Sequence, residues 1–285
     1  ANRVFPDAVA YGGWQMDQHV PGGIMDFDKL PSRILNFDGC YTIPYRCFVN
    51  KNIPNLMMAG RDISTSKMAF GSTRVMGTCA IGGQAVGTAA ALAIAHGCTP
   101  EGVEDSMDEL QQTLLKDDCY IPGLTNQDPA DLARAARASA SSSRPGFGPE
   151  QVLSGIARTE EGGQSNLWCS APEAAPWLEL QWDAPVALRQ IRLTLDPDLS
   201  QERCISVSKA FLDKEPLGVA PTLLRDYTVT AYLDGKAVFS TRVADNHQRL
   251  NILDLSQAVS ADALRVEIQA TNGSPEARIF EIRAY

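Results

Sequence analysis

The sequence is poor in the residues and motifs that build the commonest metal and hydrolase sites. Only three histidines occur among 285 residues, and they lie far apart in the chain, at positions 19, 96 and 247. The seven cysteines form no C-x-x-C pair, and no G-x-S-x-G turn is present. A transition-metal centre and a Ser-His-Asp hydrolase therefore have no support, and an odd number of cysteines leaves at least one thiol free.

An excess of basic residues and a long run of large apolar residues are also missing. Lys and Arg number 25 against 34 Asp and Glu, which gives a net charge of −9. Nucleic-acid binding needs a cationic face, so we expect none. The alanine-rich stretch from about 78 to 96 is poor in large apolar side chains, so we expect a core helix and no membrane span. The first residues, ANRVFPDAVA, show no signal-peptide pattern and do not indicate a localisation.

Length and composition predict two folded units. A chain of 285 residues with 44% hydrophobic residues is near twice the usual domain size. The stretch SSSRPGFGP is rich in Ser, Pro and Gly and is typical of a hinge. We therefore predict a first unit over 1–125, a helical linker over 126–146 and a second unit over 147–285.

The first unit contains a glycine-rich stretch between two apolar segments. Residues 56–59 (LMMA) are typical of a short strand buried on both faces, as in α/β sheets, and 64–73 are polar and irregular. The helix predicted over 78–96 contains Gly82, Gly83 and Gly87. Each interior glycine costs a helix about 1 kcal/mol relative to alanine. We therefore expect a sheet or a flat ligand to lie against bare backbone here.

The run IPYRCFVNKNIPNLMMAGRDISTSKMAFGSTRVMGTCAIGGQAVGTAAALA resembles the C-terminal flavin-contacting segment of FAD-dependent oxidoreductases, whose fold is similar to that of glutathione reductase and fumarate reductase flavoproteins. This resemblance implies that FAD is the cofactor. Carried over by position, it implies two groups of flavin contacts. The ribityl and pyrophosphate contacts are Gly60, Arg61 and Asp62. The contacts to the isoalloxazine edge are Met76, Gly77, Thr78 and Cys79.

One position departs from the family pattern. Many relatives have an acidic residue directly after the AG pair, whereas here Arg61 occupies this position and Asp62 follows it. A lone thiol in a Gly/Ala helix such as Cys79 is also typical of packing. The N-terminus of the helix nevertheless suits an electron-rich group, because its N–H groups are unpaired and its dipole end is positive.

Four residues are candidates for substrate chemistry. His19, in YGGWQMDQHVPGGI, resembles a family motif, and an imidazole can take a proton from a hydroxyl or amine while hydride leaves for the flavin. Tyr45, Arg46 and Arg74 are the other candidates over the flavin face, and Arg74 resembles an anion-binding arginine of fumarate-reductase-like enzymes. A structural histidine and salt-bridged arginines remain the alternatives.

A pyrophosphate-binding turn is missing from the N-terminal part. No strand followed by G-x-G-x-x-G precedes residue 59. We therefore expect an incomplete Rossmann-like FAD domain, the C-terminal part of a longer flavoprotein. Its partners would be the N-terminal FAD-binding portion, missing here or carried by another chain, and a small-molecule substrate.

The second unit changes to period-two alternation and is predicted to be an all-β sandwich. Short strand patterns recur from WLELQW to ARIFEIRAY, and Asp234–Gly235 is a hairpin signal. The order of these segments resembles discoidin, or galactose-binding-like, jelly rolls found in carbohydrate-binding modules. This resemblance implies a glycan partner, with Trp168 as the candidate sugar platform. Trp177 and Trp182 are expected in the core or at a domain join, and Asp196 and Asp198 in turns.

Two functions from different classes remain. In the first, the assembled protein is an FAD oxidoreductase acting on a small hydroxylated or amino-bearing substrate. In the second, the sandwich is a carbohydrate-binding module, and the flavin-like segment is a scaffold without activity.

Overall fold

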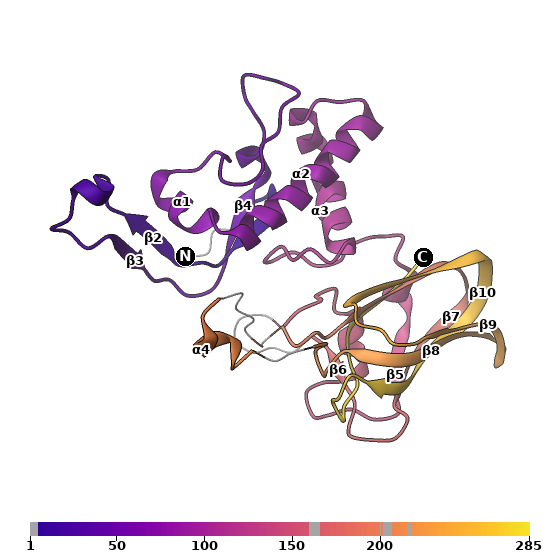
Figure 1. Cartoon of the computed structure of the whole chain (residues 1–285). Helices are drawn as coiled ribbons and strands as arrows, with labels where there is room; N and C mark the ends of the chain where they lie inside the picture. The colour runs from indigo at the N-terminus through magenta and orange to yellow at the C-terminus, as the bar shows by residue number, and fades with distance from the viewer. Residues whose placement is uncertain (1–4, 160–165, 200, 202–206, 216–217) are drawn as a thin grey trace. The chain divides into compact units, whose positions relative to one another are not determined.

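The structure is a computed structural model that describes residues 5–159, 166–199, 201, 207–215 and 218–285 (Figure 1). Cys204, one of the seven cysteines, lies outside these residues. The chain forms two compact units, Ala1–Asn126 and Gln127–Tyr285.

The first unit combines two small antiparallel sheets with three α-helices. Its strands are β1 (Ala8–Gly12), β2 (Met16–His19), β3 (Ser32–Leu35) and β4 (Tyr41–Pro44). Its α-helices are α1 (Lys67–Thr73), α2 (Met76–His96) and α3 (Met107–Lys116). Its 3₁₀ turns are η1 (Gly23–Met25), η2 (Tyr45–Cys47) and η3 (Glu101–Ser106).

The core of the first unit forms around β1, β4 and the buried faces of α2 and α3. β1 pairs with β4, and the Gln111 side chain of α3 donates to the Pro6 and Ala8 carbonyls at 2.8 and 2.9 Å. The buried amide thus satisfies two backbone acceptors at the start of β1, where a two-stranded sheet needs partners. β2 pairs with β3 in a separate hairpin that projects from the unit (Figure 1).

Helix α2 packs through small side chains. Ala85, Ala89 and Ala93 are buried at positions four residues apart, so they share one face of the helix. The helix ends at Gly97, whose left-handed φ of 64° suits glycine. Small residues allow close contact with the neighbouring β1 and α3.

By length and composition, α2 could cross a membrane. Its most apolar 18-residue window has a mean hydropathy of 1.4, and 28% of that window is buried. The expectation that this helix is too poor in apolar residues for a span was therefore wrong on composition. The absence of a membrane span stays a prediction.

Two local predictions in the first unit were wrong. The LMMA segment forms no strand of a sheet, and it contributes only an isolated bridge between Met57 and Val49. Residues 67–73, expected to be irregular, form α1, since the Ser66 hydroxyl caps the helix by accepting from the Ala69 N–H at 3.2 Å. The polar composition of this segment concealed a capped helix.

The second unit is a seven-stranded antiparallel sheet. Its strands are β5 (Arg137–Ala140), β6 (Trp168–Cys169), β7 (Trp177–Leu195), β8 (Leu224–Leu233), β9 (Lys236–Val243), β10 (Leu250–Thr271) and β11 (Arg278–Ala284). Its short helical segments are η4 (Leu132–Ala135), η5 (Pro149–Leu153) and α4 (Lys209–Leu212).

Two long strands turn this sheet into a β-sandwich. β10 pairs with the first part of β7 through residues 263–267 and with its last part through 250–254, and the register shifts between these stretches. Such shifts let long strands bend, so the sheet closes over one apolar core. The predicted hairpin joins β8 and β9, with Asp234 and Gly235 at φ 51° and 72°. Trp182 lies in the core as expected.

The predicted helical linker is instead part of the sandwich. β5 pairs with β7, and Ala133 of η4 is fully buried in the sandwich core. The contact boundary lies between Asn126 and Gln127. The alanine-rich composition of this segment suggested a helix, but residues 137–140 pair with β7 as strand β5.

Candidate functional site

Three charged or titratable side chains of the first unit form one cluster. Asp17 Oδ2 lies 2.7 Å from Arg74 Nη2 and 3.1 Å from His19 Nε2. Arg74 Nη2 also lies 3.1 Å from His19 Nε2. The structure therefore brings together His19 and Arg74, two of the predicted catalytic residues separated by 55 positions, and adds Asp17 between them.

Tight packing of α1 against β2 creates this cluster. The Gln18 amide donates to the Met68 carbonyl at 3.1 Å. A Cβ built on Gly71 would lie 2.8 Å from the Asp17 carbonyl oxygen and 2.4 Å from Gln18 Nε2. Only glycine lets the helix approach this closely, and Arg74 follows at its C-cap.

A second set of hydrogen bonds ties α1 to β4 and to the segment before β2. The Ser72 hydroxyl donates to the Trp14 carbonyl and lies 2.5 Å from the Tyr41 hydroxyl. Burial raises the pKa of Tyr41, although the hydrogen bond with Ser72 works in the opposite direction. Tyr41 therefore stays protonated near neutral pH and serves as a structural hydrogen-bonding group.

Tyr45, one of the predicted catalytic residues, lies in the core of the first unit. It is fully buried, and its hydroxyl donates to the Pro100 carbonyl at 2.7 Å. Burial, together with the charges of Glu104 and Cys98, raises its pKa. Because no part of its ring is exposed, Tyr45 cannot contact a substrate, and this prediction was wrong.

Arg46 has partners of its own away from the cluster. Its Nη1 lies 2.6 Å from Asp7 Oδ1, and its guanidinium lies 5.1 Å from the centre of the Phe5 ring. The salt bridge that the sequence left as the alternative is thus present.

The start of α2 is open, as a flavin contact would require. Val75 is the N-cap residue, and no described side chain caps the helix. The first backbone hydrogen bond runs from Cys79 N to Val75 O at 3.0 Å. Met76 is 84% exposed, whereas Thr78 is buried. Cys79 Sγ lies 3.5 Å from the Thr73 carbonyl, which favours packing for this thiol.

The predicted ribityl contacts lie on a surface loop. Gly60 adopts a φ of +109°, which side chains rarely adopt, and Arg61 and Asp62 are exposed. Ile63 anchors the loop in the core, and the Ser64 N–H donates to the Cys47 carbonyl at 2.8 Å.

The glycines of α2 divide into two kinds. A Cβ on Gly82 would lie 2.7 Å from the Phe48 ring, so this glycine is explained by the chain's own packing. At Gly77, Gly83 and Gly87, a Cβ would meet no described atom within 4 Å. Close approach within the chain thus explains Gly82, whereas Gly77, Gly83 and Gly87 lie exposed on the helix and no described packing requires a glycine there.

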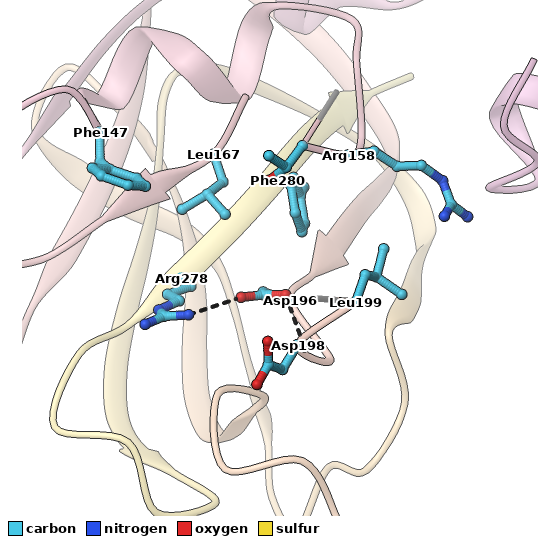
Figure 2. A pocket seen from close by; sticks show the side chains of 9 residues that line it. Phe147, Arg158, Leu167, Asp196, Asp198, Leu199, Arg278 and Phe280 are labelled. Carbon is cyan, nitrogen blue, oxygen red and sulfur yellow. Dashed lines mark hydrogen bonds and ion pairs between the residues drawn. The ribbon is translucent and has the colours of Figure 1, made fainter. Parts of the chain in front are cut away.

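The sandwich contains a cavity of about 380 Å³ (Figure 2). Its lining combines aromatic, aliphatic and charged side chains: Phe147, Arg158, Thr159, Leu167, Asp196, Asp198, Leu199, Arg278 and Phe280. Figure 2 shows the Arg278 guanidinium directed at the Asp196 carboxylate, with Phe147 and Leu167 above this pair in the view. Arg278 Nη1 and Asp196 Oδ2 lie 3.3 Å apart.

Neighbouring groups hold the charged side of this cavity in place. Asp196 is buried and its Oδ1 accepts from the Asp198 N–H at 2.8 Å. Arg278 also donates to Glu276 at 3.4 Å. Burial works against the charged form of Arg278, but Asp196 and the other acidic neighbours raise its pKa overall. Asp198 has a φ of 56°, consistent with the turn predicted for it, yet it also lines the cavity, which the sequence did not reveal.

Trp168 is not a sugar platform. The residue is fully buried, and its Nε1 donates to the Ser142 carbonyl at 3.0 Å. A stacking platform needs an exposed ring face, so this prediction was wrong. Because Trp168 precedes the first long strand, the sequence suggested that it lies in a loop. In the structure it lies in β6, which pairs with β11.

The cysteines and acidic residues offer no metal site within the described ranges. No group of three His, Cys, Asp or Glu is placed to hold an ion there. Burial, followed by the charge of Glu276, raises the pKa of Cys169 to about 11, so its thiol is unreactive at neutral pH.

Comparisons with known proteins separate the same two regions. Residues 1–114 match the model of a family described as FAD dependent oxidoreductase, which confirms the predicted resemblance. Residues 131–217 match a domain of unknown function. No curated protein matches the chain.

Several solved structures of carbohydrate-binding modules are similar to the C-terminal part. A Streptococcus pneumoniae fucose binding module is 11% identical, covering 55% of this chain and 97% of its own, with a TM-score of 0.42. The lectin domain of Lectinolysin complexed with Lewis B antigen is 15% identical, covering 55% and 96%, with a TM-score of 0.43. A family 32 module of C. perfringens NanJ in complex with galactose is 13% identical, covering 53% and 94%, with a TM-score of 0.38.

Proposed function

We propose that the first unit is the C-terminal part of an FAD-dependent oxidoreductase that acts on a small hydroxylated or amino-bearing substrate. The observation that carries this proposal is the Asp17–His19–Arg74 cluster, because Arg74 immediately precedes the open start of α2. The family match over residues 1–114 supports it. The N-terminal FAD-binding portion of the protein would complete the site.

The residues present fit such a cofactor. Gly77 offers bare backbone at an uncapped helix start, and this arrangement suits the electron-rich edge of a flat ring. Gly60, Arg61 and Asp62 would lie toward the ribityl and pyrophosphate groups. When bound, FAD would supply the acceptor for hydride.

The chain's own residues would handle charge and protons. Arg74 would bind an anionic group of the substrate, since its guanidinium stays partly exposed beside Asp17. His19 would take the proton from the substrate hydroxyl or amine as hydride leaves the adjacent carbon, and the carbon–oxygen or carbon–nitrogen bond becomes double. The side chain of His19 is 64% exposed and can reach a bound molecule.

The test is the flavin content of the full-length protein that contains this chain. We expect flavin absorbance after native purification, and we expect it to be lost in Gly77→Val, at a position where an added Cβ would have no neighbour outside its own helix within 4 Å among the described residues. The matched control is Gly97→Asn, at the far end of α2, where a left-handed φ tolerates asparagine. A colourless wild-type protein, or a Gly77→Val variant that keeps its flavin, would refute the proposal.

A specific observation favours carbohydrate binding as a second candidate function, located in the sandwich. The cavity joins the Phe147 ring to the fixed Asp196–Arg278 pair. A sugar presents an apolar C–H face and hydroxyls that both donate and accept hydrogen bonds, so it matches this combination. In this proposal the cavity replaces Trp168 as the glycan site.

This second function is tested by titrating the chain with fucose, galactose or glucosamine and recording the NMR chemical shifts of the protein. We expect shifts at Phe147 and Phe280 that disappear in Arg278→Gln. Arg137→Gln is the control, because Arg137 forms an exposed pair with Asp183 and does not line the cavity. No shift at the cavity with any of these sugars, or shifts that survive in Arg278→Gln, would reject it.

A further inference from the structure

Asp17 connects the two residues that the proposed function uses. One carboxylate oxygen, Oδ2, faces both Arg74 Nη2 and His19 Nε2. The other, Oδ1, is buried and has no hydrogen-bond partner in the described part of the chain. The whole hydrogen-bonding capacity of this carboxylate is therefore concentrated on its two side-chain neighbours.

Asp17 and Arg74 favour opposite protonation states of His19 Nε2. A carboxylate only accepts hydrogen bonds, and a guanidinium only donates them. Asp17 at 3.1 Å therefore favours a proton on Nε2, whereas Arg74 at 3.1 Å favours a bare Nε2 lone pair. The two demands cannot be met by the same tautomer.

The other hydrogen-bonding partners of Asp17 and Arg74 decide which tautomer of His19 is favoured. Asp17 already has one buried oxygen without a donor, so losing the histidine N–H would leave the carboxylate further undersatisfied, and such groups are costly. Arg74 has five N–H groups, keeps its 2.7 Å contact with Asp17, and is 30% exposed, so water can accept from the rest. The Asp17 demand therefore outweighs the demand of Arg74.

We propose that Asp17 is a positioning residue that holds the proton of neutral His19 on Nε2 and leaves Nδ1 as the proton acceptor. The use of Nδ1 in catalysis rests on the proposed oxidoreductase function, whereas the tautomer itself does not. The residue acts through His19 and Arg74 and does not itself accept the substrate proton.

The tautomer can be measured in this chain without flavin or substrate. Two-bond ¹H–¹⁵N correlation spectra of the ¹⁵N-labelled chain, recorded at alkaline pH and assigned with His19→Gln, distinguish protonated from bare ring nitrogens. We expect a bare Nδ1 and a protonated Nε2. Asp17→Asn keeps the side-chain size but removes the charge, so Arg74 then dominates and the Nδ1-protonated population rises several-fold.

Two further variants keep the test decisive. Arg74→Gln should retain the Nε2-protonated form, because the demand of Asp17 remains. Asp26→Asn is the matched control, since Asp26 lies on the same hairpin and pairs with Lys29. A wild-type His19 protonated on Nδ1, or identical tautomer populations in wild type and Asp17→Asn, would overturn the inference. A full-length protein without flavin would instead reject the oxidoreductase proposal and leave the tautomer result intact.

Discussion

The two units differ in how completely they bury their large apolar side chains. In the sandwich, Trp168, Leu178 and Leu180 are fully buried within a single core. In the first unit, Ile24 and Phe27 of the β2–β3 hairpin region are 90% and 91% exposed, and Met76 at the start of α2 is 84% exposed. Exposed apolar side chains that form a contiguous patch often mark surfaces that another molecule covers, whereas single ones are common on protein surfaces. The first unit thus exposes three large apolar side chains at 84% or more, whereas among the described residues of the sandwich only Val207, at 101%, is exposed to that degree.

Removing the Trp168 ring should lower the stability of the sandwich more than any other change predicted here. Trp168→Ala leaves a cavity and deletes the hydrogen bond to Ser142, which should cost about 3–5 kcal/mol of sandwich stability. Urea unfolding followed by far-UV circular dichroism would show it. Trp14→Ala, at a ring 57% exposed in the first unit, should change stability by less than about 1 kcal/mol. Equal losses in both variants would contradict the difference in burial.

Two adjacent glycines of α2, Gly82 and Gly83, should respond in opposite ways to substitution by alanine. Gly82→Ala must displace the Phe48 ring and should destabilise the unit by about 1–3 kcal/mol. Gly83→Ala meets no described atom and should stabilise the helix by about 0.5–1 kcal/mol. Thermal unfolding of both variants measures the contrast. Destabilisation by Gly83→Ala would show that this face is already filled in the isolated chain.

The sandwich should also respond to acid through Glu276. Burial opposes ionisation, but hydrogen bonds from Cys169 and Arg278 and the charge of Arg144 lower the pKa of Glu276 below its ordinary value of 4.5. A lowered folded-state pKa means that the stabilisation is present above the unfolded-state value and is lost as pH falls through the folded-state value. Stability measured between pH 6 and 3 should therefore fall less steeply in Glu276→Gln. An unchanged slope would contradict the assignment.

The smallest effect is expected at Arg46. Its side chain is 54% exposed, so its ion pair with Asp7 is well solvated. Arg46→Ala should cost about 0.2–1 kcal/mol, and the cost should shrink in 1 M salt. A loss that is large and independent of salt, measured by chemical unfolding, would assign this residue a role beyond the exposed pair.

Local sequence signals predicted the fold where the backbone itself decides the structure. Asp234 and Gly235 adopt the left-handed backbone that a tight hairpin requires, so their pair predicted the β8–β9 connection. The alternation of apolar and polar residues around Trp182 predicted a strand, and β7 (Trp177–Leu195) contains this segment. The LMMA segment failed because an apolar run does not specify a strand partner, and Val49 supplies only a bridge.

The candidate site was partly predictable: the sequence identified two of its residues but not how they contact each other. His19 and Arg74 were named from a motif resemblance, but neither spacing nor composition shows that one carboxylate joins them. Tyr45 failed because it packs in a core of residues from distant parts of the chain, where its hydroxyl donates to the Pro100 carbonyl, and the local sequence does not show these contacts. The cavity escaped detection since Asp196 and Arg278 are 82 positions apart.

The bare face of α2 has a practical consequence for experiments. Single cysteines placed at Gly83 or Gly87 could carry a spin label or fluorophore pointing into open space, since no described atom lies within 4 Å of either Cβ. Cys169, whose pKa is raised to about 11, should react slowly under the same labelling conditions. The helix would then report the arrival of any covering molecule as a change in label mobility, whatever that molecule's identity.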